Sequence, residues 1–235
     1  MKAVETRNLR KVYKSGEIEV EALAGVDLDV EEGDLVLISG PSGSGKTTLL
    51  NVLGALDRPT SGKVRILGQD ISDLSDDDLS DLRLRTVGFV FQAYNLIPTL
   101  TAYENIEFPM VLSARSQNQR RQRVEELLGL VGLENRARNK PDQLSGGEQQ
   151  RIAVARALAN DPKIILADEP TGNLDTRSSD RVFALLKEVN EVLGVTIIAV
   201  SHDPKFLQHC RTGVIIVDGR IAELGPAASW SNRAG

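Results

Sequence analysis

Residues 35–47 read Leu35-Val36-Leu37-Ile38-Ser39-Gly40-Pro41-Ser42-Gly43-Ser44-Gly45-Lys46-Thr47, an apolar run that leads into a glycine-rich loop. The apolar run predicts a buried strand, and the spacing of apolar residues after Lys46 predicts a helix. The loop between them has the pattern G-x-x-x-x-G-K-[ST], in which glycines let backbone N–H groups surround phosphate oxygens. The N-terminus of the following helix adds positive potential for the same anion. This order of strand, loop and helix predicts a binding site for a nucleoside triphosphate.

Strand-like and helix-like segments alternate along much of the chain around this loop. Further strands are expected at residues 63–67, 86–91, 164–167, 196–201 and 213–217. Helices are expected at residues 46–55, 75–84, 119–130, 146–159 and 178–192. Several of the strands are almost continuously apolar, as parallel strands covered on both faces are. The pattern therefore predicts an α/β fold with a mostly parallel sheet.

Three regions depart from this alternation within what we expect to be a single domain over residues 1–235. Residues 4–9 and 18–30 read as antiparallel strands joined by a turn at Ser15-Gly16, which predicts an N-terminal antiparallel β subdomain. Residues 93–160 carry helical signals and no good strand, which predicts a helical subdomain inserted into the sheet domain. Residues 226–235 are small and polar and are expected to form a flexible tail.

The composition argues against several classes of protein. The formal net charge is −5, which gives no support to nucleic-acid binding. The basic residues of 117–123 read as a solvated helix face, because Glu125 and Glu126 follow them closely.

Cys210 is the single cysteine, so no internal disulfide can form and a reducing compartment is expected. The first residues lack the apolar core of a signal peptide, and the longest apolar stretches are only of strand length. We expect a soluble chain, with any membrane-spanning part on another polypeptide.

Two later motifs narrow the kind of nucleotide site. Residues 144–148 read Leu144-Ser145-Gly146-Gly147-Glu148, and the apolar residues 164–167 end in Asp168-Glu169. A phosphate loop, a Leu-Ser-Gly-Gly-Glu run and a strand ending in two carboxylates, in this order and spacing, resemble the ATP-binding cassette ATPases. The resemblance covers nearly the whole chain and implies a P-loop nucleoside triphosphatase core.

This resemblance implies hydrolysis of ATP with Mg²⁺ as cofactor. The motifs place Lys46 on the β- and γ-phosphates. They place the Thr47 hydroxyl and the Asp168 carboxylate on Mg²⁺. Glu169 is expected to orient or polarise the water that attacks the γ-phosphate.

Three further residues gain a role from their position in the family pattern. Gln92 ends the expected strand 86–91, where the family has a glutamine that senses the γ-phosphate and the metal. His202 follows the expected strand 196–201, where the family has a histidine that hydrogen-bonds the γ-phosphate. Tyr13 lies between the first two strands, where the family has an aromatic residue that stacks on adenine; packing alone is the alternative. The expected catalytic residues are therefore Glu169, Lys46, His202 and Gln92.

The Leu-Ser-Gly-Gly-Glu run implies a second copy of the chain. In the family two cassettes pack head to tail, so that Ser145 and the amides of Gly146 and Gly147 cap a γ-phosphate held by the other subunit. Asp175 resembles the carboxylate that touches the opposing subunit. The expected assembly is an ATP-dependent homodimer. The residues expected to contact nucleotide are Tyr13, Gly40, Pro41, Ser42, Gly43, Ser44, Gly45, Lys46, Thr47, Thr48, Ser145, Gly146, Gly147 and Asp175. The residues expected around the metal are Thr47, Gln92 and Asp168.

Residues 53–62, 89–98 and 101–106 resemble one branch of the family, which serves lipoprotein release and macrolide export. Its members pair with an integral membrane permease, which implies a cytoplasmic chain held at the inner face of the cell membrane. The apolar segment Tyr94-Asn95-Leu96-Ile97-Pro98 is the expected contact for that permease, with core packing as the alternative. A soluble cassette ATPase, or a regulator of a cell-envelope process that moves no substrate, remains an open alternative.

Overall fold

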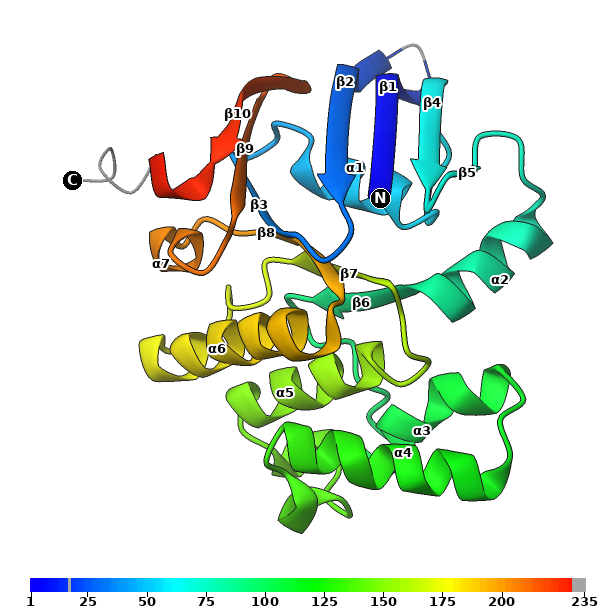
Figure 1. The fold of residues 1–235 in the computed structure, drawn as a ribbon, viewed down its shortest axis with the longest axis vertical. Coiled ribbons are helices and arrows are strands. Elements are labelled where there is room, and N and C mark those ends of the chain that lie inside the picture. The colour runs from blue at the N-terminus through cyan, green and yellow to red at the C-terminus, as the bar shows by residue number, and fades with distance from the viewer. Residues whose placement is uncertain (17, 230–235) are drawn as a thin grey trace.

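The computed structural model describes residues 1–16 and 18–229, and it contains two β-sheets with helices between and below them (Figure 1). The smaller sheet is antiparallel and has the strand order β2-β1-β4-β5. Its strands are β1 (Lys2–Ser15), β2 (Ile18–Glu31), β4 (Ser61–Ile66) and β5 (Gln69–Asp70). The predicted antiparallel N-terminal sheet is confirmed.

Strand β4 corrects one expectation, because it lies in the smaller sheet rather than among the strands of the α/β core. Only its alternate residues Val64 and Ile66 are buried. A strand with one face on the core and the other facing solvent is typical of antiparallel sheets. The charged residues Lys63 and Arg65 are the sequence signal for this placement.

The larger sheet has the strand order β10-β9-β3-β8-β7-β6. All neighbouring pairs run parallel except β10, which pairs antiparallel with β9. The strands are β3 (Leu35–Ser39), β6 (Val87–Phe91), β7 (Ile164–Asp168), β8 (Thr196–Val200), β9 (Thr212–Val217) and β10 (Arg220–Pro226). The predicted mostly parallel sheet is confirmed. Strand β10, which is half exposed and mixed in composition, is not predicted from the sequence.

Helices cover both faces of the larger sheet (Figure 1). Helix α1 (Lys46–Leu53) packs its buried leucines into one cluster with apolar side chains of both sheets, and so ties the sheets together. The opposite face is covered by α5 (Gly146–Ala157) and α6 (Thr176–Leu193), and α3 (Ala102–Leu112) and α4 (Gln117–Leu130) pack against α5. The remaining helical segments are α2 (Asp76–Thr86), α7 (Pro204–Leu207), η1 (Glu134–Arg136), η2 (Pro141–Gln143) and η3 (Ala227–Ser229). Among the described residues no helix is both long and apolar enough to cross a membrane.

The stretch between β6 and β7 contains helices and loops only. Its buried residues, such as Ile106, Leu127 and Ile152, belong to the same cluster as Leu37 and Ile165 of the larger sheet. The insertion that we place at 93–160 therefore shares its core with the sheet. Helix α3 is missed by apolar periodicity, because Pro109 lies inside it and three of its large apolar residues, Phe108, Val111 and Leu112, are exposed.

The tail expected over 226–235 needs correction where the structure describes it. Pro226 is the last residue of β10, and Ala227 is fully buried at the start of η3. The backbone N–H of Ala227 donates to the carbonyl of Arg211 at 2.9 Å, which holds the start of this segment against β9. Residues 230–235 lie outside the described residues.

Candidate functional site

The phosphate loop spans the turn from the end of β3 to the start of α1. Gly40 has φ of 142°, and a Cβ atom there would lie 2.0 Å from the carbonyl oxygen of Ile216. A Cβ atom on Gly45 would lie 2.3 Å from the carbonyl oxygen of Ala22. Glycine at these two positions is therefore required both by backbone conformation and by space.

The ammonium group of Lys46 lies inside this loop. It donates to the carbonyl oxygens of Gly40 at 2.9 Å and Pro41 at 2.8 Å, and the residue is only 6% exposed. Burial lowers the pKa of Lys46, while the nearby carboxylates of Glu169 and Asp168 oppose that shift. A buried cation held by neutral carbonyl oxygens forms a stronger contact when an anion replaces them.

A cavity of about 310 Å³ opens beside the loop. Most of its lining side chains and backbone groups are polar, and they come from the phosphate loop, from β2 and from the ends of β7 and β8. The lining residues are Val20, Glu21, Ala22, Ser42, Gly43, Gly45, Lys46, Thr47, Thr48, Glu169, Val200 and His202. The structure thus brings the predicted phosphate loop, Glu169 and His202 to one place.

Two adjacent carboxylates lie at the end of β7. The Thr47 hydroxyl donates to Oδ1 of Asp168 at 3.2 Å. Burial raises the pKa of Asp168, although the Thr47 hydrogen bond and the Lys46 charge oppose the shift. Burial also raises the pKa of Glu169, and the charges of His202 and Lys46 oppose it. Two partly buried carboxylates next to each other are stabilised when a cation binds beside them, so this end of β7 suits a cation.

Glu169 adopts a backbone conformation that is rare outside glycine, with φ of 47°. Its N–H donates to the carbonyl of Val200 at 3.0 Å, which fixes the residue against the end of β8. Its Oε1 lies 3.1 Å from Nε2 of His202. In this conformation the side chain of Glu169 lines the cavity and meets the histidine.

Gln92 is not brought into this group. Its Nε2 donates to Oδ1 of Asn173 at 3.3 Å, and the Asn173 amide donates back to the Gln92 carbonyl at 3.1 Å. Gln92 therefore does not line the cavity with Thr47 and Glu169, and its role as metal ligand and phosphate sensor stays a prediction. Asn173, which the sequence reasoning did not single out, is the partner that holds it.

Tyr13 lies on β1 directly opposite Val20 of β2, and Val20 lines the cavity. The tyrosine is 40% exposed, so one part of its ring is free to meet a ligand. Its hydroxyl donates to Oδ2 of Asp57 at 2.8 Å. The placement agrees with a base-stacking role, which remains a prediction.

Ser145 caps the N-terminus of α5 and lies outside the lining of the chain's own phosphate cavity. Its Oγ accepts from the N–H of Glu148 at 3.3 Å, and Oε2 of Glu148 accepts from the N–H of Ser145 at 2.8 Å. Glu148 thus completes a capping box. A Cβ atom on Gly147 would lie 2.9 Å from Oγ of Ser178, so the first turns of α5 and α6 are adjacent.

Asp175 caps α6 in the same way. Its Oδ1 accepts from the N–H of Ser178 at 3.0 Å, and its Oδ2 accepts from the Ser178 hydroxyl at 2.7 Å. These bonds lower the pKa of Asp175, so its carboxylate is charged at neutral pH. The adjacent N-termini of α5 and α6 form a second region with helix-dipole potential suited to an anion.

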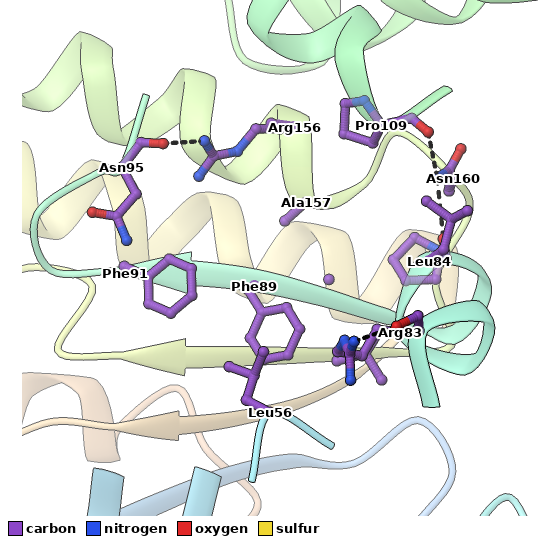
Figure 2. A pocket seen from close by; sticks show the side chains of 14 residues that line it. Leu56, Arg83, Leu84, Phe89, Phe91, Asn95, Pro109, Arg156, Ala157 and Asn160 are labelled. Atoms are coloured by element: carbon purple, nitrogen blue, oxygen red, sulfur yellow. Dashed lines mark hydrogen bonds between the residues drawn. The ribbon is translucent and has the colours of Figure 1, made fainter. Parts of the chain in front are cut away.

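A second cavity, of about 460 Å³, lies between β6, α2 and α5 (Figure 2). Leu56, Phe89 and Phe91 contribute much of its apolar lining, and Arg83 and Arg156 are its two cations. Of the five residues 94–98 expected to meet a permease, only Asn95 lines this groove. The lining residues come from four separate segments of the chain, so no single motif marks this groove in the sequence.

Arg156 links this groove to the loop that follows Gln92. Its guanidinium donates to the carbonyl of Tyr94 at 2.9 Å and also to the carbonyl of Asn95 (Figure 2). Tyr94 and Asn95 have φ values of 60° and 51°, so the loop turns sharply here. Within the described residues neither Arg156 nor Arg83 forms an ion pair with a carboxylate.

Comparison with known proteins shows the family to which a chain with this site belongs. Residues 23–172 match the family described as ABC transporter. The chain belongs to the ABC transporter family. The lipoprotein-releasing system ATP-binding protein LolD of Anaeromyxobacter dehalogenans is 49% identical over 224 residues, which are 95% of this chain and 94% of LolD. The macrolide export ATP-binding/permease protein MacB of Syntrophobacter fumaroxidans is 49% identical over 223 residues, 94% of this chain but 31% of MacB.

A solved ABC structure has the same fold. It is the dimeric post-hydrolysis state of the cassette MJ0796 of Methanocaldococcus jannaschii, bound to ADP and Pi. The TM-score is 0.88 at 46% sequence identity, and the match covers 95% of this chain and 98% of the other. The predicted P-loop fold, membership of the ABC ATPases, ATP binding and ATPase activity are confirmed.

Proposed function

We propose that this ABC ATPase hydrolyses MgATP at sites shared by two copies of the chain and drives a membrane permease. The observation that carries the proposal is the separation of two anion-binding regions on one chain. The phosphate loop and the carboxylate of Glu169 line one cavity, and Asp168 is hydrogen-bonded to Thr47 of that loop. Ser145 and the N-termini of α5 and α6 lie outside this cavity. A second copy, packed head to tail, supplies the missing half of each site.

The donor set beside the phosphate loop fits Mg²⁺. The Thr47 hydroxyl and the Asp168 carboxylate lie 3.2 Å apart, and Mg²⁺ prefers oxygen ligands shared between protein, water and phosphate. The raised pKa of Asp168, caused by burial, marks a carboxylate that gains stability when a cation enters. When bound, the ion supplies charge neutralisation at the β- and γ-phosphates.

Hydrolysis then depends on the pair Glu169 and His202. We assign to Glu169 the orientation of the attacking water, because its carboxylate lies in the cavity and its backbone is fixed at Val200. His202, with Nε2 at 3.1 Å from that carboxylate, orients Glu169 in the free chain and can donate to the γ-phosphate when ATP is present. Lys46 exchanges its two carbonyl partners for phosphate oxygens.

The dimer is held by the nucleotide in this proposal. Ser145, Gly146 and Gly147 of one copy cap the γ-phosphate bound by the other, with Asp175 at the same interface. The negative charge of MgATP is costly to bury between two protein surfaces unless both contribute donors. Loss of the γ-phosphate removes that bridge and lets the copies separate, so ATP acts as a two-state switch.

The groove of Figure 2 is the proposed permease contact, in place of residues 94–98 alone. Its apolar lining suits a short amphipathic helix, and its two guanidinium groups suit an acidic side chain on that helix. Pro109 of α3 also lines the groove, and the same helix carries the exposed apolar residues Phe108, Val111 and Leu112. Arg156 connects the groove to residues 94–95, and α5 connects it to Ser145, so permease and nucleotide can sense each other.

The similarity to LolD and MacB supports lipoprotein release, export or mechanical transmission as the process driven. The chain would then lie in the cytoplasm, attached to the inner face of the membrane through its permease. No nucleic-acid partner is proposed. A soluble ATPase, or a regulator that moves no substrate, is the alternative, and capture of partners decides between them.

The first experiment uses Glu169→Gln, which keeps the size of the side chain and removes its charge. We expect this variant to bind MgATP, hydrolyse it at a rate reduced by at least a hundredfold and elute as a dimer. The double variant Glu169→Gln with Ser145→Arg is the matched control, because it leaves the phosphate loop intact and should stay monomeric. A monomeric Glu169→Gln variant with MgATP would refute the shared site.

The tagged Glu169→Gln dimer then serves to capture partners from solubilised native membranes, with the double variant as control. Recovery of a permease with few spans and a large extracytoplasmic domain supports release, export or mechanical transmission. Recovery of a six-span permease with a soluble binding protein indicates uptake instead. Recovery of no membrane protein favours the soluble ATPase.

A further inference from the structure

The side chains of Lys11, Tyr13 and Asp57 form a charged cluster around the tyrosine that is predicted to stack on the base. Oδ1 of Asp57 accepts from the Lys11 ammonium at 2.5 Å and from the N–H of Arg58 at 2.8 Å. Oδ2 of Asp57 accepts from the Tyr13 hydroxyl at 2.8 Å. Lys11 also donates to the Arg58 carbonyl at 2.9 Å. One carboxylate therefore holds both the lysine and the tyrosine.

The lysine also occupies one face of the tyrosine. Its ammonium nitrogen lies 4.9 Å from the centroid of the Tyr13 ring and over it. A cation in this position is attracted by the ring quadrupole. The side chain of Lys11 is 12% exposed, so it is packed in place, whereas Tyr13 is 40% exposed. The ring consequently has one face occupied by Lys11, while 40% of the surface of Tyr13 stays exposed.

The cluster links the smaller sheet to the segment that follows helix α1. Tyr13 and Lys11 lie on β1 of the smaller sheet, and Asp57 follows the C-terminus of α1. Helix α1 begins at Lys46 in the phosphate loop, so Asp57 is tied to that loop by about 12 Å of regular helix. The carboxylate thus fixes the distance between the tyrosine ring and the phosphate-binding residues.

We propose that Asp57 is a positioning residue for nucleotide binding: it holds the Tyr13 ring, with Lys11 on one face, as a preformed platform for the base of ATP. The proposal rests on the role of Tyr13 in the proposed function. An exposed tyrosine on a free strand edge samples several rotamers, and ordering it on binding lowers affinity. A ring already fixed by a charged hydrogen bond avoids that loss.

The charge state of the carboxylate supports this arrangement. Burial alone would raise the pKa of Asp57, but the hydrogen bonds from Lys11, Tyr13 and the Arg58 backbone hold it below its ordinary value. Asp57 is therefore ionised at neutral pH, as a charge-assisted bond to the Tyr13 hydroxyl requires. An amide at position 57 would keep the size and lose the charge.

The test measures the Kd for MgATP and for magnesium tripolyphosphate, which has the phosphates and no base. We expect Asp57→Ala and Asp57→Asn to weaken MgATP binding about threefold to tenfold and to leave tripolyphosphate binding unchanged. The KM for ATP should rise by the same factor, with kcat within about twofold. Tyr13→Phe, which keeps the ring and removes the donor to Asp57, should reproduce this loss, and Tyr13→Phe with Asp57→Ala should add nothing further.

Other outcomes separate the two ideas. If Tyr13→Ala weakens MgATP binding but Asp57→Ala and Asp57→Asn do not, the tyrosine platform stands and the positioning role of Asp57 is wrong. If Tyr13→Ala leaves the affinity unchanged, the base does not stack on Tyr13, and both ideas fail. Equal weakening of MgATP and tripolyphosphate by Asp57→Asn would show a general effect on α1 and would also overturn the positioning role.

Discussion

Nε2 of His202 lies 3.1 Å from Oε1 of Glu169, across the ends of two neighbouring parallel strands. The register of β7 and β8 pairs Asp168 with Val200, so Glu169, one residue after β7, and His202, two residues after β8, reach the same cavity. This contact between Glu169 and His202 holds the Glu169 carboxylate in one orientation. Loss of Glu169 or His202 should therefore affect catalysis more than loss of other carboxylates or of the other histidine of the chain.

Replacing His202 by Ala should reduce kcat by about a hundredfold or more, since it removes both the partner of Glu169 and a donor to the γ-phosphate. The Kd for MgATP should change by less than about threefold, because the phosphate loop is intact. His209→Ala is the control: the only other histidine contacts the Phe183 ring and lies outside the cavity. Equal kcat values for the two variants would exclude His202 from catalysis.

The buried carboxylates should oppose folding of the nucleotide-free protein. Burial raises the folded-state pKa values of Asp168 and Glu169. The folded chain therefore binds these protons more tightly than the unfolded chain, and their unfavourable effect on stability is fully present above the raised pKa values. It disappears as the pH falls through the raised pKa toward the unfolded values near 4.

Asp168→Asn and Glu169→Gln should accordingly raise the thermal midpoint of the nucleotide-free protein at pH 7.5, by about 2–4 °C for each kcal/mol gained. The difference from the natural chain should shrink as the pH is lowered toward 5. Glu191→Gln is the matched control, because Glu191 is 62% exposed and its ion pair within the described residues is with Lys187 on its own helix. A lower midpoint for both site variants at pH 7.5 would contradict the interpretation.

The sequence predicts this site well where a role depends on neighbours in the chain. The phosphate loop, Asp168 and Glu169 each follow an apolar strand directly, so the parallel sheet brings them together at one edge. His202 follows the adjacent strand and reaches the same edge. To predict that such residues lie together, one needs to know only that their strands are parallel and adjacent. The continuous apolar runs already indicate a parallel sheet.

Features that depend on side-chain direction or on distant segments are not predicted. Gln92 ends a predicted strand, yet its amide turns to Asn173, about eighty residues further along the chain. The groove of Figure 2 combines residues from four segments, and its key cation Arg156 is inside a helix. Helix α3 could have been found from its capping box, Thr101 with Glu104 three residues later, despite the internal proline.

Two glycines of the phosphate loop should respond differently to alanine. Gly40→Ala places a Cβ atom 2.0 Å from the carbonyl of Ile216 at φ of 142°, and should cost on the order of 3 kcal/mol of stability and abolish ATP binding. Gly43→Ala meets nothing within 4 Å and carries only the strain of its φ of 78°, about 1–2 kcal/mol. Chemical denaturation measures both, and similar losses would contradict the geometry.

Glu148 should act on stability through its capping box. Glu148→Ala removes the acceptor for the Ser145 N–H and should cost about 1 kcal/mol in denaturant unfolding. Glu148→Gln keeps an acceptor of the same length and should cost less than about 0.5 kcal/mol. If the glutamine variant lost as much as the alanine variant, the charge facing Arg136 at 3.3 Å, rather than the cap, would be the important contact.

Leu56 allows the groove of Figure 2, our proposed permease contact, to be tested without touching the nucleotide site. It lines the groove with 48% of its surface exposed, so an aspartate there can remain solvated and leave the fold intact. Leu56→Asp should keep the ATPase activity of the isolated chain within about twofold and lose capture of the permease, because a charge would enter an apolar contact. Leu224→Asp is the matched control, since Leu224 is 49% exposed on β10 and lies outside the groove. Retained permease capture by Leu56→Asp, or its loss in both variants, would place the contact elsewhere on the chain.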